Sequence, residues 1–251
     1  MFNSKVFLAE FVGTFALVFF GVNAGLFVKD DLIGLAAVYG LTMVAFVFAY
    51  GKISGAHLNP AVSVGLASAG KFDWNLVAPY IAFQMMGAIV GAVLVFLFYG
   101  PHYTATSDAD AKLATFCTAP AIRSPLSNLF CEVVGTVVLV LAVLLSVDPS
   151  IDFGEVNLVV PATGKIGLGT LGALPVGLLV LSIGLSLGGT TGYAINPARD
   201  LGPRIAHALL PVPGKRDSDW GYAWIPVVGP LLGAVVATAI AAVLADVPLA
   251  S

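Results

Sequence analysis

The sequence predicts an all-α membrane protein with six transmembrane helices and two re-entrant half-helices, built as an inverted repeat of three spans plus three. Three observations indicate this fold class. The 251-residue chain is 59% hydrophobic and 10% charged, with a mean hydropathy of +0.98, whereas a soluble domain carries about 25% charged residues. Apolar stretches long enough to cross a bilayer recur along the chain. Landmarks of the first half also recur, in the same order, in the second half.

Six segments have the ~20 apolar residues that a helix needs to cross the hydrocarbon core. They are residues 6–27, 32–50, 76–99, 129–147, 171–187 and 223–244. The first is not expected to be a cleaved signal peptide, because it lacks a basic start, contains Glu10 and exceeds the usual apolar core of such a peptide. Turn-rich stretches at 101–127, 148–169 and 211–221 connect the spans. We therefore expect a single transmembrane domain over residues 1–251.

Two further apolar segments, 61–69 and 198–210, are too short to span a membrane. Each follows a Gly-rich turn and an Asn-Pro-Ala tripeptide, which begins at Asn59 in the first copy and at Asn196 in the second. Asn is a strong helix N-cap and Pro is favoured at the first helical position, so each tripeptide predicts a helix start. Irregular backbone at membrane depth is tolerated only in protein or beside a wet cavity. The pair therefore predicts a cavity.

The two halves, about residues 1–125 and 126–251, share an ordered set of landmarks. The first half carries Glu10, Gly13, Thr14, Gly40, Gly55, Gly87 and Gly91, and the second carries Glu132, Gly135, Thr136, Gly177, Gly192, Gly229 and Gly233. With three spans in each half, the second half must enter the membrane from the opposite side. Sites in such inverted repeats lie at the repeat interface near the midplane.

The half-helices suggest a mechanism. Each helix N-terminus carries roughly half a positive charge, so two of them facing each other at mid-membrane would oppose cations and protons. The amides of Asn59 and Asn196 can donate hydrogen bonds to a passing water or hydroxyl.

The matched carboxylates, Glu10 and Glu132, need partners because a charge inside a span is costly. We expect each to accept hydrogen bonds from the backbone N–H groups of its own half's loop; an interfacial position is the alternative for Glu10. This scaffold would turn a ladder of carbonyls toward the lumen. The carbonyls are those of Gly55, Ala56, His57 and Leu58, and of Gly192, Tyr193, Ala194 and Ile195.

Arg199 breaks the symmetry of the repeat, since the first copy has Val62 at the same position. Arg keeps its charge in proteins and offers five donors, so at a constriction it would repel cations and bind hydroxyls. A surface position is the alternative.

The two motifs, Ser-Gly-Ala-His-Leu-Asn-Pro-Ala-Val at 54–62 and Gly-Tyr-Ala-Ile-Asn-Pro-Ala-Arg-Asp-Leu-Gly-Pro-Arg at 192–204, resemble the pore motifs of the aquaporin family of major intrinsic proteins. The resemblance covers essentially the whole chain. It implies an outer constriction formed by Tyr39, Gly184, Tyr193 and Arg199. Water-selective members typically have His where this chain has Gly184. The glycine would leave the pore open at this position. Glycerol-conducting members typically have Trp and Phe where this chain has Tyr39 and Tyr193.

Other positions resemble the glycerol-facilitator branch. Asp200 and Arg204 are four residues apart, a spacing that faces an acid and a base together on a helix, and Pro226 and Val227 stand near the start of the sixth span. The resemblance implies a passive channel for glycerol, other small neutral solutes and water that excludes ions and protons. It further implies a homotetramer in the plasma membrane bilayer with both termini cytoplasmic, and no enzyme activity.

Two alternatives are a water-selective channel and an ion-coupled secondary transporter, which would also use inverted repeats and broken helices. The sequence shows no nucleotide-binding motif, catalytic triad or metal-ligand cluster, so no cofactor or metal is expected. The net charge of −3 does not indicate a nucleic-acid partner. Cys117 and Cys131 are expected to be free thiols. The sequence does not distinguish glycerol from dihydroxyacetone, urea or small neutral acids.

Overall fold

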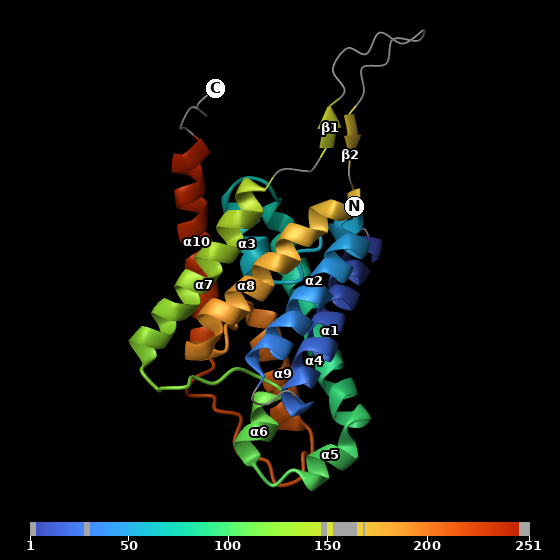
Figure 1. The fold of residues 1–251 in the computed structure, drawn as a ribbon, viewed down its shortest axis with the longest axis vertical. Coiled ribbons are helices and arrows are strands. Elements are labelled where there is room, and N and C mark those ends of the chain that lie inside the picture. The colour runs from blue at the N-terminus through green and yellow to red at the C-terminus, as the bar shows by residue number, and fades with distance from the viewer. Residues whose placement is uncertain (1–3, 28–30, 147–149, 153–164, 168, 246–251) are drawn as a thin grey trace.

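The protein is a bundle of long helices along one axis (Figure 1). The computed structural model describes residues 4–27, 31–146, 150–152, 165–167 and 169–245. Its long helices are α1 Ser4–Phe27, α2 Leu32–Ser54, α4 Trp74–Phe98, α7 Pro125–Leu145, α8 Ala173–Thr191 and α10 Ile225–Ala245. All six are long and apolar enough to cross a membrane, which confirms the predicted spans. Residue 147, where the fourth predicted span ends, lies outside the described residues.

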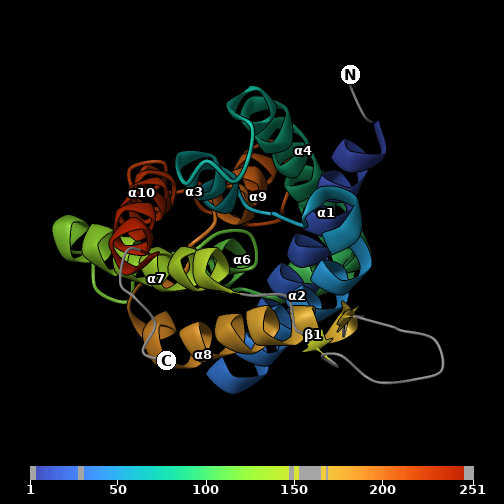
Figure 2. The ribbon, with the colours of Figure 1, turned by 90° about the horizontal axis from the view of Figure 1, so that it is seen from above.

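Two shorter helices lie inside this bundle, between α4 and α10 (Figure 2). They are α3, Pro60–Ser68, and α9, Pro197–Leu209. Both begin with the Pro of an Asn-Pro-Ala tripeptide, as predicted, because Asn supplies the N-cap and Pro has no N–H to leave unpaired. The fold is therefore the predicted set of six spans and two half-helices.

Helix packing follows the inverted repeat. In the first half α1 packs on α4, in the second α7 packs on α10, and α2 meets α8 across the two halves. A Cβ on Gly40 would lie 2.8 Å from the carbonyl oxygen of Gly177, and a Cβ on Gly177 would lie 2.6 Å from that of Gly40. Only glycine allows this approach, so the two matched residues meet where the halves cross.

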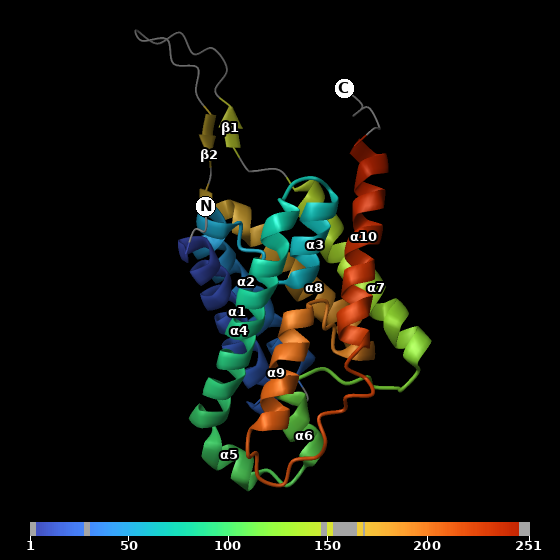
Figure 3. The same ribbon diagram turned by 180° about the vertical axis from the view of Figure 1, so that it is seen from behind.

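The two ends of the bundle differ. The start of α1, the end of α10 and a short hairpin lie at one end, whereas the helices α5, Gly100–Ala105, and α6, Ala109–Ala114, lie at the other (Figure 3). The hairpin pairs β1, Ser150–Asp152, with β2, Lys165–Gly167, in antiparallel register, and a 3₁₀ turn, Gly169–Gly172, leads into α8. The sequence predicted these connections only as turn-rich, because elements this short carry little hydrophobic periodicity.

Candidate functional site

The loops before the two half-helices share an unusual backbone. The long helix that precedes each loop ends at a left-handed glycine, which is Gly55 after α2 and Gly192 after α8. The non-glycine residues with positive φ in these loops are Ala56 at 47°, Leu58 at 51°, Tyr193 at 39° and Ile195 at 41°. Positive φ is a true outlier for a β-branched residue such as Ile195. Such strain costs on the order of 1–3 kcal/mol per residue and persists only when its surroundings hold it.

Glu10 holds the first loop. Its carboxylate, fully buried, accepts hydrogen bonds from the backbone N–H groups of His57 at 2.9 Å and Leu58 at 2.8 Å. Two side chains complete the shell, since Ser54 Oγ and Gln84 Nε2 each donate at 2.7 Å. Four donors around one carboxylate fix both the charge and the loop.

Glu132 holds the second loop in the same way. Its carboxylate accepts from the N–H groups of Ala194 at 2.9 Å and Ile195 at 2.8 Å, and it is also buried. The repeat is not perfect here. Pro226 stands three residues before the second Gly-x-x-x-Gly pair, as Gln84 stands before the first, and it has no side-chain donor. Glu132 therefore lacks the donor that Gln84 gives to the other carboxylate.

The two Asn side chains cap their own helices and bind the opposite loop. Each Oδ1 accepts from the backbone N–H two residues further on, at 2.8 Å for Asn59 and 3.0 Å for Asn196. Asn59 Nδ2 donates to the carbonyl of Ile195 at 2.9 Å, and Asn196 Nδ2 donates to the carbonyl of Leu58 at 2.8 Å. Each amide has a second N–H to offer. The carbonyls of Leu58 and Ile195, in contrast, already accept one hydrogen bond from the protein.

A cavity of about 110 Å³ runs beside these loops. The predicted carbonyl residues Gly55, Ala56, His57, Leu58, Ala194 and Ile195 line it, together with Asn59 and Asn196. Aliphatic side chains also line it, among them Leu17, Met43, Val47, Leu66, Val176 and Val180. Gly192 was also expected to face the lumen, but it is not among the lining residues, because it caps α8 and lies against Thr118. The cavity therefore combines polar loop groups with an apolar surface.

A second cavity, of about 530 Å³, is lined in part by residues of α6; it is called the outer cavity below, and the first is called the inner cavity. Among the residues that the structure describes, only Tyr39 and Arg199 line both cavities. The boundary between the cavities therefore lies at these two side chains.

Three buried side chains meet at this boundary. The Arg199 guanidinium lies 5.1 Å from the centre of the Tyr39 ring, and the rings of Tyr39 and Tyr193 meet edge to face at 5.9 Å. Arg199 Nη1 and both phenolic hydroxyls are buried without a hydrogen-bond partner in the protein. An unpaired buried polar group costs about 1–3 kcal/mol. Three polar atoms at this boundary thus have unused hydrogen-bonding capacity.

Gly184 has a different role from the one expected. A Cβ at this position would lie 3.0 Å from Tyr193 Cζ and 2.8 Å from Ala36 Cβ, and Gly184 lines neither cavity. The Tyr193 ring thus fills the space that the glycine leaves, so Gly184 contacts a residue of the lining and does not line the lumen itself.

Asp200 and Arg204 form a fully buried ion pair, not a surface bridge. Arg204 Nε and Nη2 bind the two carboxylate oxygens at 2.8 and 3.0 Å. Asp200 also accepts from the N–H and hydroxyl of Thr118, both at 2.7 Å, and Arg204 donates to the Ser218 carbonyl at 2.9 Å. The pair lines neither cavity. It ties α9 to two connections at the α6 end of the bundle.

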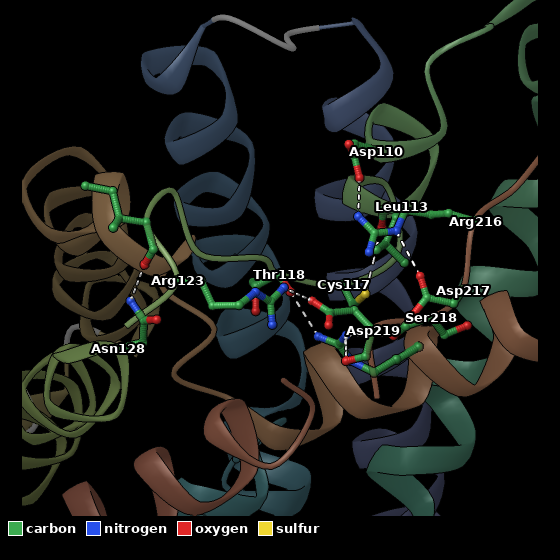
Figure 4. Close-up of polar contacts among 12 residues, drawn as sticks. Asp110, Leu113, Cys117, Thr118, Arg123, Asn128, Arg216, Asp217, Ser218 and Asp219 are labelled. Carbon is green, nitrogen blue, oxygen red and sulfur yellow. Dashed lines mark hydrogen bonds and ion pairs between the residues drawn. The ribbon is translucent and has the colours of Figure 1, made fainter. Parts of the chain in front are cut away.

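Charged side chains bridge the same connections around the outer cavity. Arg216 pairs with Asp110 of α6 and with Asp217, and Figure 4 shows it between these two carboxylates. Arg123 pairs with Asp219 at 2.6 Å. Pro226 and Val227, the other two expected markers, lie in the first turn of α10 and line neither cavity.

Sequence reasoning missed several partners of these residues. Gln84 could have been found, because a polar side chain in the middle of an apolar span usually has a specific partner. Ser54 and Thr118 carried no such signal, since hydroxyl residues are common at helix ends and in loops. The sequence also indicated no partner for His57, whose Nδ1 lies 3.0 Å from Ser63 Oγ.

Within the described ranges, no three His, Cys, Asp or Glu side chains lie close enough together to hold a metal ion.

Comparison with known proteins gives consistent matches. The sequence profile of the family described as "Major intrinsic protein" matches residues 1–241. The chain is 49% identical over 239 residues to a probable glycerol uptake facilitator protein of Thermotoga maritima, covering 92% of this chain and 95% of that one. It is 48% identical over 235 residues to the glycerol uptake facilitator protein of Bacillus subtilis, covering 90% and 80%. The crystal structure of the aquaglyceroporin from Plasmodium falciparum superposes with a TM-score of 0.78, at 33% identity, over 94% of each chain.

Proposed function

Because the chain belongs to the major intrinsic protein family, we propose that it is a passive channel for glycerol and other small neutral solutes, and for water. It is an integral multi-pass membrane protein and not an enzyme. The proposal rests on one observation above all. The inner cavity offers both polar loop groups and an aliphatic surface, and it ends at a boundary with three unpaired polar atoms. Glycerol presents hydroxyls and C–H groups together, so it complements such a lining.

The path would run from the outer cavity past Tyr39 and Arg199 and along the two loops. At the boundary, Arg199 Nη1 and the phenolic hydroxyls replace the water lost from a solute hydroxyl. Further in, the second N–H of each Asn amide donates to a hydroxyl or water oxygen. Tyr rings and aliphatic side chains meanwhile contact the carbon backbone of the solute.

Exclusion of ions would come from fixed positive charge. The N-termini of α3 and α9 meet beside Asn59 and Asn196, and each carries roughly half a positive charge. Arg199 adds a full charge at the boundary. Cations are therefore repelled at two places, at Arg199 and at the two helix N-termini. A water whose oxygen accepts from both Asn amides does not take part in a continuous hydrogen-bonded chain that could conduct protons.

The buried carboxylates support a channel over an ion-coupled transporter. A coupling site needs a carboxylate that can exchange its cation or proton during transport. Glu10 and Glu132 are instead matched across the repeat and occupied by donors from their own loops. They fit a scaffold role.

We further infer a single channel domain, with repeats at about residues 1–125 and 126–251, assembled as a homotetramer in the plasma membrane. With both termini cytoplasmic, the outer cavity and Arg199 would face the exterior. Exposed aliphatic side chains on the spans, such as Leu97 and Val243, would contact lipid or neighbouring subunits.

Osmotic experiments on proteoliposomes test the function. Vesicles with the purified protein should shrink quickly in hyperosmotic glycerol and then re-swell as glycerol enters, with or without a proton gradient. Fast shrinking without re-swelling would indicate a water-selective pore and would contradict the proposal. Re-swelling only with a gradient would indicate a coupled transporter and would contradict the channel.

A further inference from the structure

We propose that glycines behind the two tyrosines set which solutes pass, by giving each ring a notch into which it withdraws from the lumen. The α8 notch consists of Gly184 and Gly188, and the α1 notch consists of Gly21. This inference rests on the proposed channel function. It adds Gly188 and Gly21, which do not belong to the four expected constriction residues, as positioning residues for selectivity.

The α8 notch receives Tyr193. Gly184 and Gly188 are four residues apart and so lie on one face of the helix. A Cβ on Gly188 would lie 2.7 Å from Tyr193 Cδ1 and 3.1 Å from Cε1. Contacts this short do not occur between real side chains, so any larger residue must displace the ring. Tyr193 is almost completely buried and its hydroxyl has no protein partner, so its position follows from this packing and not from a hydrogen bond.

The α1 notch receives Tyr39, although Gly21, unlike Gly184 and Gly188, itself lines the outer cavity. A Cβ on Gly21 would lie 2.2 Å from Tyr39 Cε1 and 2.4 Å from Cζ. On its other sides the ring faces Tyr193 and the Arg199 guanidinium. Displacement away from α1 therefore moves the Tyr39 ring toward Tyr193 and Arg199, within the boundary between the two cavities.

The direction of displacement gives the functional consequence. Tyr193 has α8 behind it and lines the inner cavity. A side chain at 188 that restores an ordinary contact distance pushes the ring by several tenths of an ångström into that cavity. A single-file water needs less width than a carbon chain. Glycerol permeability should thus fall more than water permeability.

Gly188→Ala, reconstituted in proteoliposomes, tests this. We expect its ratio of glycerol to water permeability to fall about tenfold, the scale on which one methylene changes discrimination in a close-fitting site. Urea, which is shorter, should be affected less than glycerol. Gly189→Ala is the matched control, because the neighbouring Gly189 has no heavy atom within 4 Å of an added Cβ, and its ratio should stay that of the wild type.

A second variant distinguishes positioning from general packing. In a Tyr193→Ala background, Gly188→Ala should no longer change the ratio, since no ring remains to be displaced. Equal losses of water and glycerol permeability in Gly188→Ala, or an effect that persists without the ring, would overturn the inference. If Gly188→Ala does not fold, the Tyr193→Ala background should restore folding; failure to do so would also overturn it.

The outcomes remain separate from those of the proposed function. Absence of glycerol permeability in the wild type would contradict the proposed function alone. The role of the α8 notch would then be tested by the ratio of urea to water permeability in the same variants. The same test applies to α1. The ratio of glycerol to water permeability is measured for Gly21→Ala alone and for Gly21→Ala in a Tyr39→Ala background.

Discussion

The side-chain amide of Asn196 donates to the backbone carbonyl of Leu58 at 2.8 Å, across the interface between the two halves of the repeat. Asn59 returns the same bond to Ile195. Each half-helix cap is thus also a tie to the opposite loop. Leu58 and Ile195 both have positive φ, so these ties hold two strained residues in place.

Asn196→Asp should abolish conduction of both water and glycerol. The variant keeps the capping oxygen but loses the donor to Leu58, and it places a carboxylate next to that carbonyl. Light-scattering permeability measurements on proteoliposomes check this. Asn75→Asp, at an exposed position in the first turn of α4, is the control and should conduct normally. Normal conduction by Asn196→Asp would show that the tie is dispensable.

Glu132→Gln should weaken the second loop. Hydrogen bonds to a charged group contribute about 1.5–3 kcal/mol each, and the amide retains only one acceptor oxygen for two backbone donors. We expect a lower midpoint of thermal unfolding in detergent, together with a loss of glycerol and water permeability. Glu10→Gln is the comparison for the first loop. There the Gln84 side-chain amide also donates to the carboxylate, a contact that Glu132 lacks. Unchanged unfolding and conduction in Glu132→Gln would exclude the scaffold role.

Arg199→Val should let cations and protons through while glycerol still passes. The first repeat already has Val62 at this position of its half-helix, so the backbone accommodates the change. Removing the charge leaves the helix N-termini as the remaining barrier. A pH-sensitive dye trapped in the vesicles should report faster proton entry than in the wild type. Proton entry at the wild-type rate would show that the helix N-termini at Asn59 and Asn196 exclude protons without Arg199.

Tyr193→Phe should lower glycerol permeability and leave stability unchanged or higher. The hydroxyl has no partner within the protein, so its removal loses about 1 kcal/mol of interaction with a solute, about fivefold in rate, and costs the fold nothing. Tyr39→Phe should behave alike. Thermal unfolding and glycerol influx, measured on the same preparations, test both halves of the prediction. Lower stability in either variant would indicate a structural hydroxyl.

Arg204→Met should lower the free energy of unfolding by about 3–5 kcal/mol, because it leaves the Asp200 carboxylate buried without its partner. The double variant Asp200→Leu with Arg204→Met should be less harmful than either single change. Denaturation midpoints in detergent measure the effect. A double variant as unstable as the sum of the two single variants would show that Asp200 and Arg204 act independently.

The sequence alone indicated the spans, the half-helices and the order of the repeat. Hydrophobic length and N-cap preference are properties of local segments, and a bilayer converts them directly into helices. The matched Glu residues were interpretable for the same reason, since a carboxylate in an apolar span requires a donor. Arg199 stood out because the other repeat provides an internal reference at Val62.

Only the tertiary structure decided what the side chains do together. The bond between Asn59 and Ile195 joins residues 136 positions apart, and no local pattern encodes that distance. Gly184 illustrates the limit, since a missing side chain leaves space, but only packing decides that the Tyr193 ring fills it. The Asp200–Arg204 pair has a helical spacing typical of surface bridges, yet the fold buries it completely. The sequence therefore determined which segments enter the membrane, and the close packing of distant segments determined the shape and polarity of the cavity between them.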